Sequence, residues 1–96
     1  MGSLLARCLG IATRDALSHE MLIIVLERRS TLSRTEARAA ILDYLGLTRD
    51  ELIAQLQIAP ETLKTYWKRA YRKVGCRDRR ELRQWVEQIL RQELGP

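Results

Sequence analysis

The chain has 96 residues, which suffice for one domain with a modest core and exclude a second folded unit of ordinary size. Its composition, 46% hydrophobic and 30% charged with few Gly and Pro, favours a globular domain built from helices over one built from strands. The positive charge is concentrated in residues 61–83, which contain nine Lys and Arg and three acidic residues, a net charge of +6. Because the formal charge of the whole chain is +5, the remaining residues sum to −1. Such a clustered positive field attracts polyanions, although charge alone is equally typical of a solvated helix face.

The first part of the chain (residues 1–30) is predicted to be a helical extension for packing or dimerisation. Residues 1–13 carry apolar side chains at helical spacing, and residues 15–29 predict a helix that begins after Thr13 or Asp15. The run 21–26 is apolar around most of the helix circumference, so we expect the segment to be covered. It either packs on the rest of the chain or pairs with a second copy. A β-strand is the alternative for so short a run, which is also too short to cross a bilayer.

A capping-box spacing, in which Ser or Thr is followed three residues later by Glu, occurs twice in the middle of the chain. Ser33–Glu36 predicts a helix that runs to about Leu45, and Gly46 suits the positive φ that often ends a helix. Thr48–Glu51 predicts a short helix over residues 49–55.

Pro60 marks a tight turn, because the residue before a proline avoids the helical region. The next helix is predicted over residues 61–74, with Gly75 as its stop, and the last over residues 78–93. A short helix, a turn of three or four residues and a second helix have helix-turn-helix geometry. The predicted fold is therefore all-α.

The helix over residues 61–74 has two different faces. Its apolar stripe is formed by Leu63, Trp67, Ala70 and Val74. After Glu61 the helix has no acid, and Lys64, Lys68 and Arg72 align on the other side. Ordinary surface helices mix charge signs, so an anionic partner explains this face better. Such a helix can enter the major groove of DNA, where lysine reaches guanine acceptors, while hydroxyls and free helix N–H groups hold phosphate.

Residues 46–82 read GLTRDELIAQLQIAPETLKTYWKRAYRKVGCRDRREL. This stretch resembles, without a gap, the DNA-binding domain of the LuxR/FixJ (GerE) family of bacterial transcription regulators. The matching positions are Gly46, Leu47, Glu51, Leu56, Ile58, Thr62, Lys64, Lys73, Gly75, Arg79, Glu81 and Leu82, with Leu32, Ser33 and Glu36 upstream. The resemblance covers about residues 32–90. It implies a tetrahelical LuxR-type helix-turn-helix domain over residues 31–96, preceded by the N-terminal helical segment.

The resemblance also implies roles for individual residues. Base contacts are expected from Lys64, Thr65 and Lys68. Phosphate contacts are expected from Thr62 and Lys73 by the resemblance, and from Arg69 and Arg72 as further cations of the same helix. A homodimer on an inverted repeat of double-stranded DNA is expected to form through Leu82, Trp85, Val86 and Ile89. RNA polymerase is a further candidate partner, and the expected location is cytoplasmic and nucleoid-associated, with no membrane contact.

Three residues depart from the family pattern. Tyr66 stands in place of the usual His, Ile53 in place of a small Ala between the two motif helices, and Trp67 in place of an aliphatic residue. Trp67, like Tyr71 and Trp85, is interpreted as a core or interface residue, not as a platform for stacking bases.

The two cysteines, Cys8 and Cys76, fit neither a disulfide framework nor a zinc spacing. Cys76 lies beside Arg77 and Arg79, so a reactive thiolate is one interpretation and a buried apolar thiol the other. Arg79 is interpreted as structural. No nucleophile–base pair, metal-ligand spacing or phosphate loop appears, so neither an enzyme nor a metal or other cofactor is predicted.

Two alternative functions stay open. A sigma-factor region 4-like promoter-binding domain shares the four-helix motif, but residues 73–82 favour the LuxR type. A protein-interaction module on the same fold is the other, with residues 1–30 as its binding segment. The family normally joins this domain to a receiver or ligand-binding domain, for which the N-terminal segment is too short. The chain is thus expected to be a stand-alone regulator or a fragment of a longer one.

Overall fold

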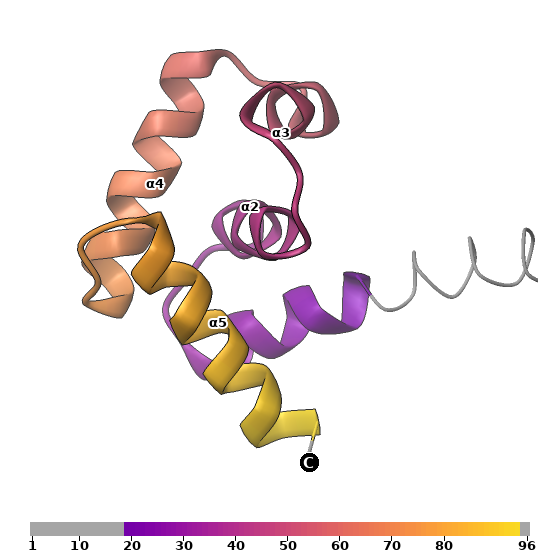
Figure 1. Cartoon of the computed structure of the whole chain (residues 1–96), viewed down its shortest axis with the longest axis vertical. Helices are drawn as coiled ribbons and strands as arrows, with labels where there is room; N and C mark the ends of the chain where they lie inside the picture. Colours follow the sequence, from indigo (N-terminus) through magenta and orange to yellow (C-terminus); the bar gives the residue numbers. More distant parts are fainter. Residues whose placement is uncertain (1–18, 95–96) are drawn as a thin grey trace, which may run out of the picture.

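The computed structural model of the chain describes residues 19–94, and these form helices and short connections without any strand (Figure 1). A first helix covers residues 19–29, followed by α2 (Arg34–Tyr44), α3 (Arg49–Leu56), α4 (Pro60–Val74) and α5 (Arg79–Leu94). The all-α prediction is confirmed, and the strand alternative for the apolar run is wrong. The helical pattern of residues 1–13 and the proposed helix start at Thr13 or Asp15 lie outside the described residues.

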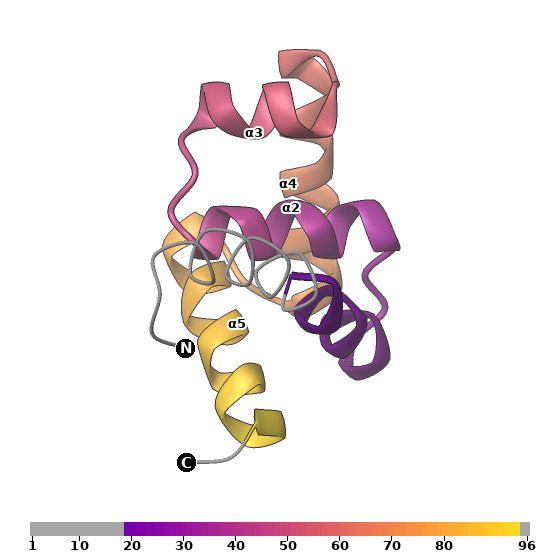
Figure 2. The same ribbon diagram turned by 90° about the vertical axis from the view of Figure 1, so that its right-hand side faces the viewer.

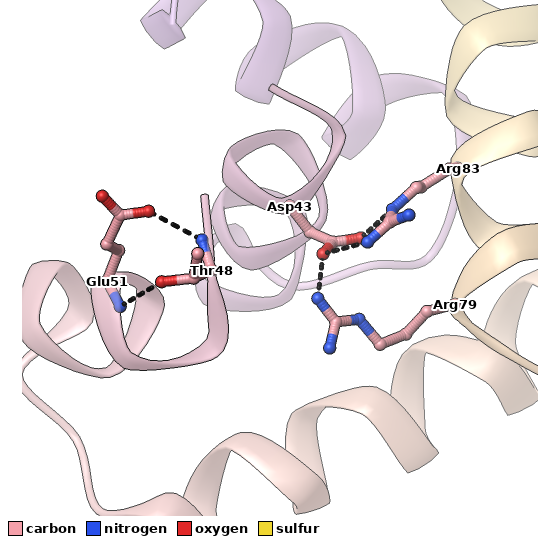
Figure 3. A network of polar contacts seen from close by, with 5 residues as sticks. All are labelled: Asp43, Thr48, Glu51, Arg79 and Arg83. Atoms are coloured by element: carbon pink, nitrogen blue, oxygen red, sulfur yellow. Dashed lines mark hydrogen bonds and ion pairs between the residues drawn. The ribbon is translucent and has the colours of Figure 1, made fainter. Parts of the chain in front are cut away.

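Both predicted capping boxes are present, and each fixes the start of a helix. In α2, the Ser33 hydroxyl accepts from the Glu36 N–H at 3.2 Å while the Ser33 N–H donates to the Glu36 carboxylate at 3.0 Å. In α3, Thr48 and Glu51 make the same reciprocal bonds at 3.2 and 2.8 Å (Figure 3). These bonds satisfy backbone donors that a helix start otherwise leaves without a partner.

Glycines end α2 and α4 as predicted, but α3 ends differently. Gly46 and Gly75 have φ of 101° and 77°, in the region that glycine adopts readily. Gln57, the residue after α3, also has a positive φ of 55° with ψ of 51°, which a residue with a side chain adopts at a cost. Pro60 is the first residue of α4, so this helix begins one residue earlier than predicted.

The core lies around α2, which packs against α3, α4 and α5 and occupies the centre of the view in Figure 1. The largest fully buried apolar side chains are Leu26, Ile41, Leu52, Leu63, Leu82 and Val86. Burying each such side chain contributes about 1.5–3 kcal/mol, so the domain depends on residues from every helix. None of the helices within residues 19–94 has the length and apolar character needed to cross a membrane.

The helix over residues 19–29 is part of the same core, beneath α2 in Figure 2. Ile23 and Leu26 are buried in this core. The helix therefore packs on the rest of the chain, the first of the two predicted arrangements. Arg29 donates to Gln92 at 2.7 Å and lies 3.5 Å from Glu93, both near the end of α5. The division of the chain at residue 30 stays a prediction.

Candidate nucleic-acid interface

Helices α3 and α4 are joined by three residues, Gln57, Ile58 and Ala59, as the helix-turn-helix prediction requires. The left-handed Gln57 ends α3 and starts the turn, and the Ile58 N–H donates to the Ile53 carbonyl at 3.3 Å. Leu52 and Leu63 are fully buried and attach the two helices to the core. The angle between α3 and α4 is therefore set by core packing as well as by the turn.

One further contact supports the end of α3. The Arg38 guanidinium, from α2, donates to the Gln55 carbonyl in the last turn of α3 at 3.4 Å. A cation near the C-terminus of a helix is favoured by the partial negative charge of the last carbonyls. The sequence gives no local signal for this contact, because the two residues are 17 positions apart.

Helix α4 has the two faces predicted from its sequence. Leu63, Trp67 and Ala70 are buried, and Val74 is half-buried at the end of the stripe. The exposed residues on the opposite side include Lys64, Thr65, Lys68, Arg69 and Arg72. Base-contact candidates and two of the phosphate-contact candidates therefore share one exposed surface, which we call the outer face of α4.

The cations of the outer face have no carboxylate partners within residues 19–94. Lys64, Lys68, Arg69 and Arg72 are absent from every ion pair in this part of the chain. Four positive charges on one helix, with none neutralised locally, produce an additive field toward solvent. This field is what an extended polyanion would meet.

Lys73, a predicted phosphate contact, differs from these four cations because it has an internal partner. Its ammonium lies 2.7 Å from the Glu36 carboxylate, which is buried and also accepts the Ser33 N–H. Burial by itself would raise the pKa of Glu36, but Lys73 and Ser33 outweigh it and hold that pKa below its usual value near 4.5. Lysine has three donors, so two of those on Lys73 are left for another acceptor.

The two threonines of α4 are also partly engaged. The Thr65 hydroxyl donates to the Glu61 carbonyl at 3.1 Å, so this exposed side chain keeps its lone pairs and its methyl group for other contacts. Thr62 is half-buried, and its N–H, like that of Leu63, donates to the Ala59 carbonyl. Since Pro60 has no N–H, at most one free N–H remains in the first turn of α4, that of Glu61. The sequence predicted that several free N–H groups at this helix start could hold phosphate, but only the Glu61 N–H is left for that role.

An ionic cluster around a buried carboxylate joins α2 to α5 (Figure 3). The Asp43 side chain is fully buried and accepts from Arg83 at 2.9 and 3.1 Å and from Arg79. The Arg79 guanidinium also lies over the Trp67 ring, 5.2 Å from its centre, and Trp67 stacks on Tyr71. The structural interpretation of Arg79 is confirmed. We call Asp43, Arg79, Arg83 and Trp67 the junction cluster.

Sequence reasoning missed Asp43, although two signals were available. An aspartate in the last turn of a helix is unfavourable for the helix dipole, so another interaction must compensate. Asp43 also follows Ala39 and Ala40 at the spacing of the buried face of α2. A carboxylate at a core position indicates a buried cation partner.

The three departures from the family pattern occupy different surroundings. Trp67 is buried, and its ring completes the cation–π contact with Arg79. Ile53 and Tyr66 are half-buried at the border of the core. Trp85 and Tyr71 also pack against the core, in agreement with their interpretation as scaffold residues.

Cys76 has the properties of a packed thiol. Burial raises its pKa, and the nearby Glu81 and Asp78 carboxylates raise that pKa further. Those carboxylates are positioned by the start of α5, where Glu81 accepts the Arg77 N–H and Asp78 accepts the Glu81 N–H. The raised pKa favours the interpretation as a packed apolar thiol over the interpretation as a reactive thiolate. Over the described part of the chain, no group of His, Cys, Asp and Glu is arranged to hold a metal ion.

The predicted dimerisation residues lie mostly inside the chain itself. Leu82, Val86 and Ile89 are buried in the core, and only Trp85 is half-exposed. Three of these four side chains are covered by the chain's own helices. The dimer contact itself stays a prediction.

Fold and site together define a helix-turn-helix domain whose second motif helix carries, on its outer face, four cations without carboxylate partners in the described part of the chain. Over 66 residues, 69% of the chain, it is 33% identical to the HTH-type transcriptional regulator MalT of Serratia proteamaculans (strain 568). It is 32% identical over 66 residues to the protein of the same name from Cronobacter sakazakii (strain ATCC BAA-894). The chain spans about 7% of the length of these curated relatives. No protein-family profile and no solved structure matches it.

Proposed function

We propose that this chain binds double-stranded DNA as the helix-turn-helix domain of a transcription regulator of the LuxR/FixJ (GerE) type, with α4 in the major groove. The observation that carries the proposal is the outer face of α4, where four cations lack carboxylate partners within residues 19–94. The similarity to two regulators named as HTH-type supports the same function. The activity is binding, without catalysis or a cofactor.

Base reading falls to three exposed residues of α4. Lys64 and Lys68 donate to guanine O6 and N7, the acceptors that lysine meets in the major groove. Thr65 acts through its methyl group, packed on a thymine methyl, or through its lone pairs, because its proton is already donated to the Glu61 carbonyl. The readout therefore combines two charged donors with one small side chain between them.

Phosphate contacts come from the border of the same face. Arg69 and Arg72 are exposed and supply attraction that weakens as salt rises. Lys73 bridges Glu36 and a phosphate with its remaining donors, so it fixes the DNA relative to the start of α2. Thr62 offers its hydroxyl from a half-buried position.

The dimer on an inverted repeat belongs to the same proposal. Trp85 is the side chain of the predicted contact that reaches the surface, and Leu82, Val86 and Ile89 support α5 from beneath. A LuxR-type domain over residues 31–96, preceded by a helical extension, is proposed as the binding unit. A cytoplasmic, nucleoid-associated location and contact with RNA polymerase complete the proposal.

An in vitro selection of duplex DNA, followed by gel shifts on the selected site, tests the function. Lys68→Ala is expected to lose about tenfold to a hundredfold in affinity for that site and to relax one base position. The matched control is Arg28→Ala, which removes an exposed cation from the helix over residues 19–29. Unchanged binding by both Lys64→Ala and Lys68→Ala would overturn the proposal.

The selection, together with binding curves for duplex DNA and heparin, distinguishes the two alternative functions. Recovery of a promoter −35 element in place of an inverted repeat indicates a sigma-factor region 4-like domain. Binding to duplex DNA that is no tighter and no more selective than binding to heparin indicates a protein-interaction module.

A further inference from the structure

The exposed stripe of α4 begins with an acid. Glu61 is exposed in the first turn, and Lys64, Thr65 and Lys68 follow it at three, four and seven positions. Residues at these spacings lie above one another on one side of a helix. Glu61 is also the only acidic residue of α4. A carboxylate therefore stands at the leading end of the surface that carries the base-contact candidates.

The Glu61 carboxylate has no cation partner within residues 19–94. It is absent from every ion pair of this part of the chain, and only its backbone carbonyl is engaged, by the Thr65 hydroxyl. An acid in a first turn stabilises a helix through its dipole, which accounts for its presence on an isolated helix. Beside a polyanion, however, an acceptor-only group without a partner is unfavourable unless the ligand offers a donor.

The bases differ in what they offer to a carboxylate. In the major groove guanine presents two acceptors, thymine one acceptor and a methyl group, and adenine an acceptor beside its donor. Cytosine presents its N4 amino group, a donor without a neighbouring acceptor. A carboxylate at the groove floor is satisfied by cytosine and opposes the other bases, so it discriminates by repulsion as well as by attraction.

Resting on the proposed function, we propose that Glu61 is a specificity-determining residue whose carboxylate accepts a hydrogen bond from cytosine N4. Lys64 and Lys68 are donors and select guanine, whereas Glu61 is an acceptor and selects cytosine at the edge of the same recognition surface. The DNA target thus contains one cytosine next to the base that Lys64 contacts. The cations alone do not specify this position.

Parallel selections with the wild type, Glu61→Gln and Glu61→Ala test this inference. The wild type is expected to select cytosine at one position and to lose about tenfold or more in affinity when that base is replaced. The amide of Glu61→Gln pairs with adenine N6 and N7, so its preference moves to adenine. Glu61→Ala shows no preference at that position, and all three proteins share the remaining consensus.

The control is Asp50→Asn, which neutralises an exposed first-turn acid of the other motif helix. This variant is expected to keep the wild-type consensus, including cytosine. Thermal melting of each variant measures the helix-dipole contribution, which changes stability but leaves the base preference unmoved. If all variants select the same bases as the wild type, the role of Glu61 is overturned while the proposed function stands. If the wild type itself selects no consensus, both are overturned.

Discussion

The outer face of α4 and the junction between α2, α4 and α5 are both rich in lysine and arginine, yet these charges meet different surroundings. Lys64, Lys68, Arg69 and Arg72 point to solvent without carboxylate partners among residues 19–94. At the junction, Asp43 receives two arginines and Glu36 receives Lys73. Net charge along a sequence therefore combines cations without internal partners and cations that hold the fold.

The two groups of cations differ physically because only one group is paired with buried, desolvated carboxylates. A buried carboxylate requires a cation, because an unpaired charge inside a protein is costly. Arg79, Arg83 and Lys73 are thus held by Asp43 and Glu36, although Lys73 keeps two donors, whereas the four cations of the outer face of α4 keep their full field toward solvent. Replacing residues on one side or the other should separate folding stability from DNA binding.

The largest expected effect follows from removing the centre of the junction cluster. Asp43→Ala leaves Arg79 and Arg83 without their carboxylate, and the free energy of unfolding should fall by about 2–3 kcal/mol. This is less than for fully buried pairs, because both arginines keep contact with solvent. Urea unfolding measures the change. Asp50→Ala, at an exposed position, serves as the control and should change stability by less than about 0.5 kcal/mol. Equal losses in the two variants would contradict the role of the cluster.

A smaller effect, and one that depends on pH, is expected at Glu36. Its pKa is lower in the folded state than in the unfolded chain, so its stabilising contribution is complete above the unfolded value near 4.5. That contribution is lost as the pH falls through the folded pKa. Lys73→Met should lower the free energy of unfolding by about 1–2 kcal/mol at pH 7, since it removes a charged hydrogen bond.

Urea unfolding at pH 7 and again well below pH 4.5 measures this dependence. The difference between the wild type and Lys73→Met should shrink at the lower pH, where Glu36 is protonated in both proteins. Lys68→Met removes an exposed cation from the same helix and should change stability little at either pH. A difference that grows on acidification would contradict the pairing.

The smallest expected effect tests the turn that joins the two motif helices. Gln57 has a left-handed backbone, so Gln57→Gly should raise the free energy of unfolding by about 0.5–1 kcal/mol. Gln55→Gly, two residues earlier and inside α3, should instead lower it by up to about 1 kcal/mol. Chemical denaturation of the two variants measures both changes in the free energy of unfolding, which should have opposite signs. Destabilisation by Gln57→Gly would show that its side chain, and not the backbone conformation, determines the turn.

The helices could be predicted because their signals are local. Two capping boxes, two glycine stops and Pro60 each act within a few residues, and they placed α2 to α5 to within one or two residues. The faces of α4 followed from its apolar stripe in the same way. By contrast, Gln57 as a left-handed residue carries no such signal, since glycine is the usual choice there.

Apart from the structural role of Arg79, the division of the cations could not be predicted, because it depends on contacts between distant residues. Glu36 and Lys73 are 37 positions apart, and Asp43 is 36 and 40 positions from its two arginines. A sequence pattern identifies such residues as charged but not as paired. The resemblance assigned Leu82, Val86 and Ile89 to a dimer contact, but their burial by the chain's own helices depends on distant contacts as well.

The salt dependence of DNA binding, measured beside stability for Arg72→Ala and Arg83→Ala, tests the central division most directly. Arg72→Ala should reduce the slope of log affinity against log salt by about one and leave the free energy of unfolding within about 0.5 kcal/mol. Arg83→Ala should leave the slope unchanged and lower the free energy of unfolding, because it removes a partner of buried Asp43. Equal changes of slope in the two variants, or a loss of stability confined to Arg72→Ala, would contradict the division between binding and structural cations.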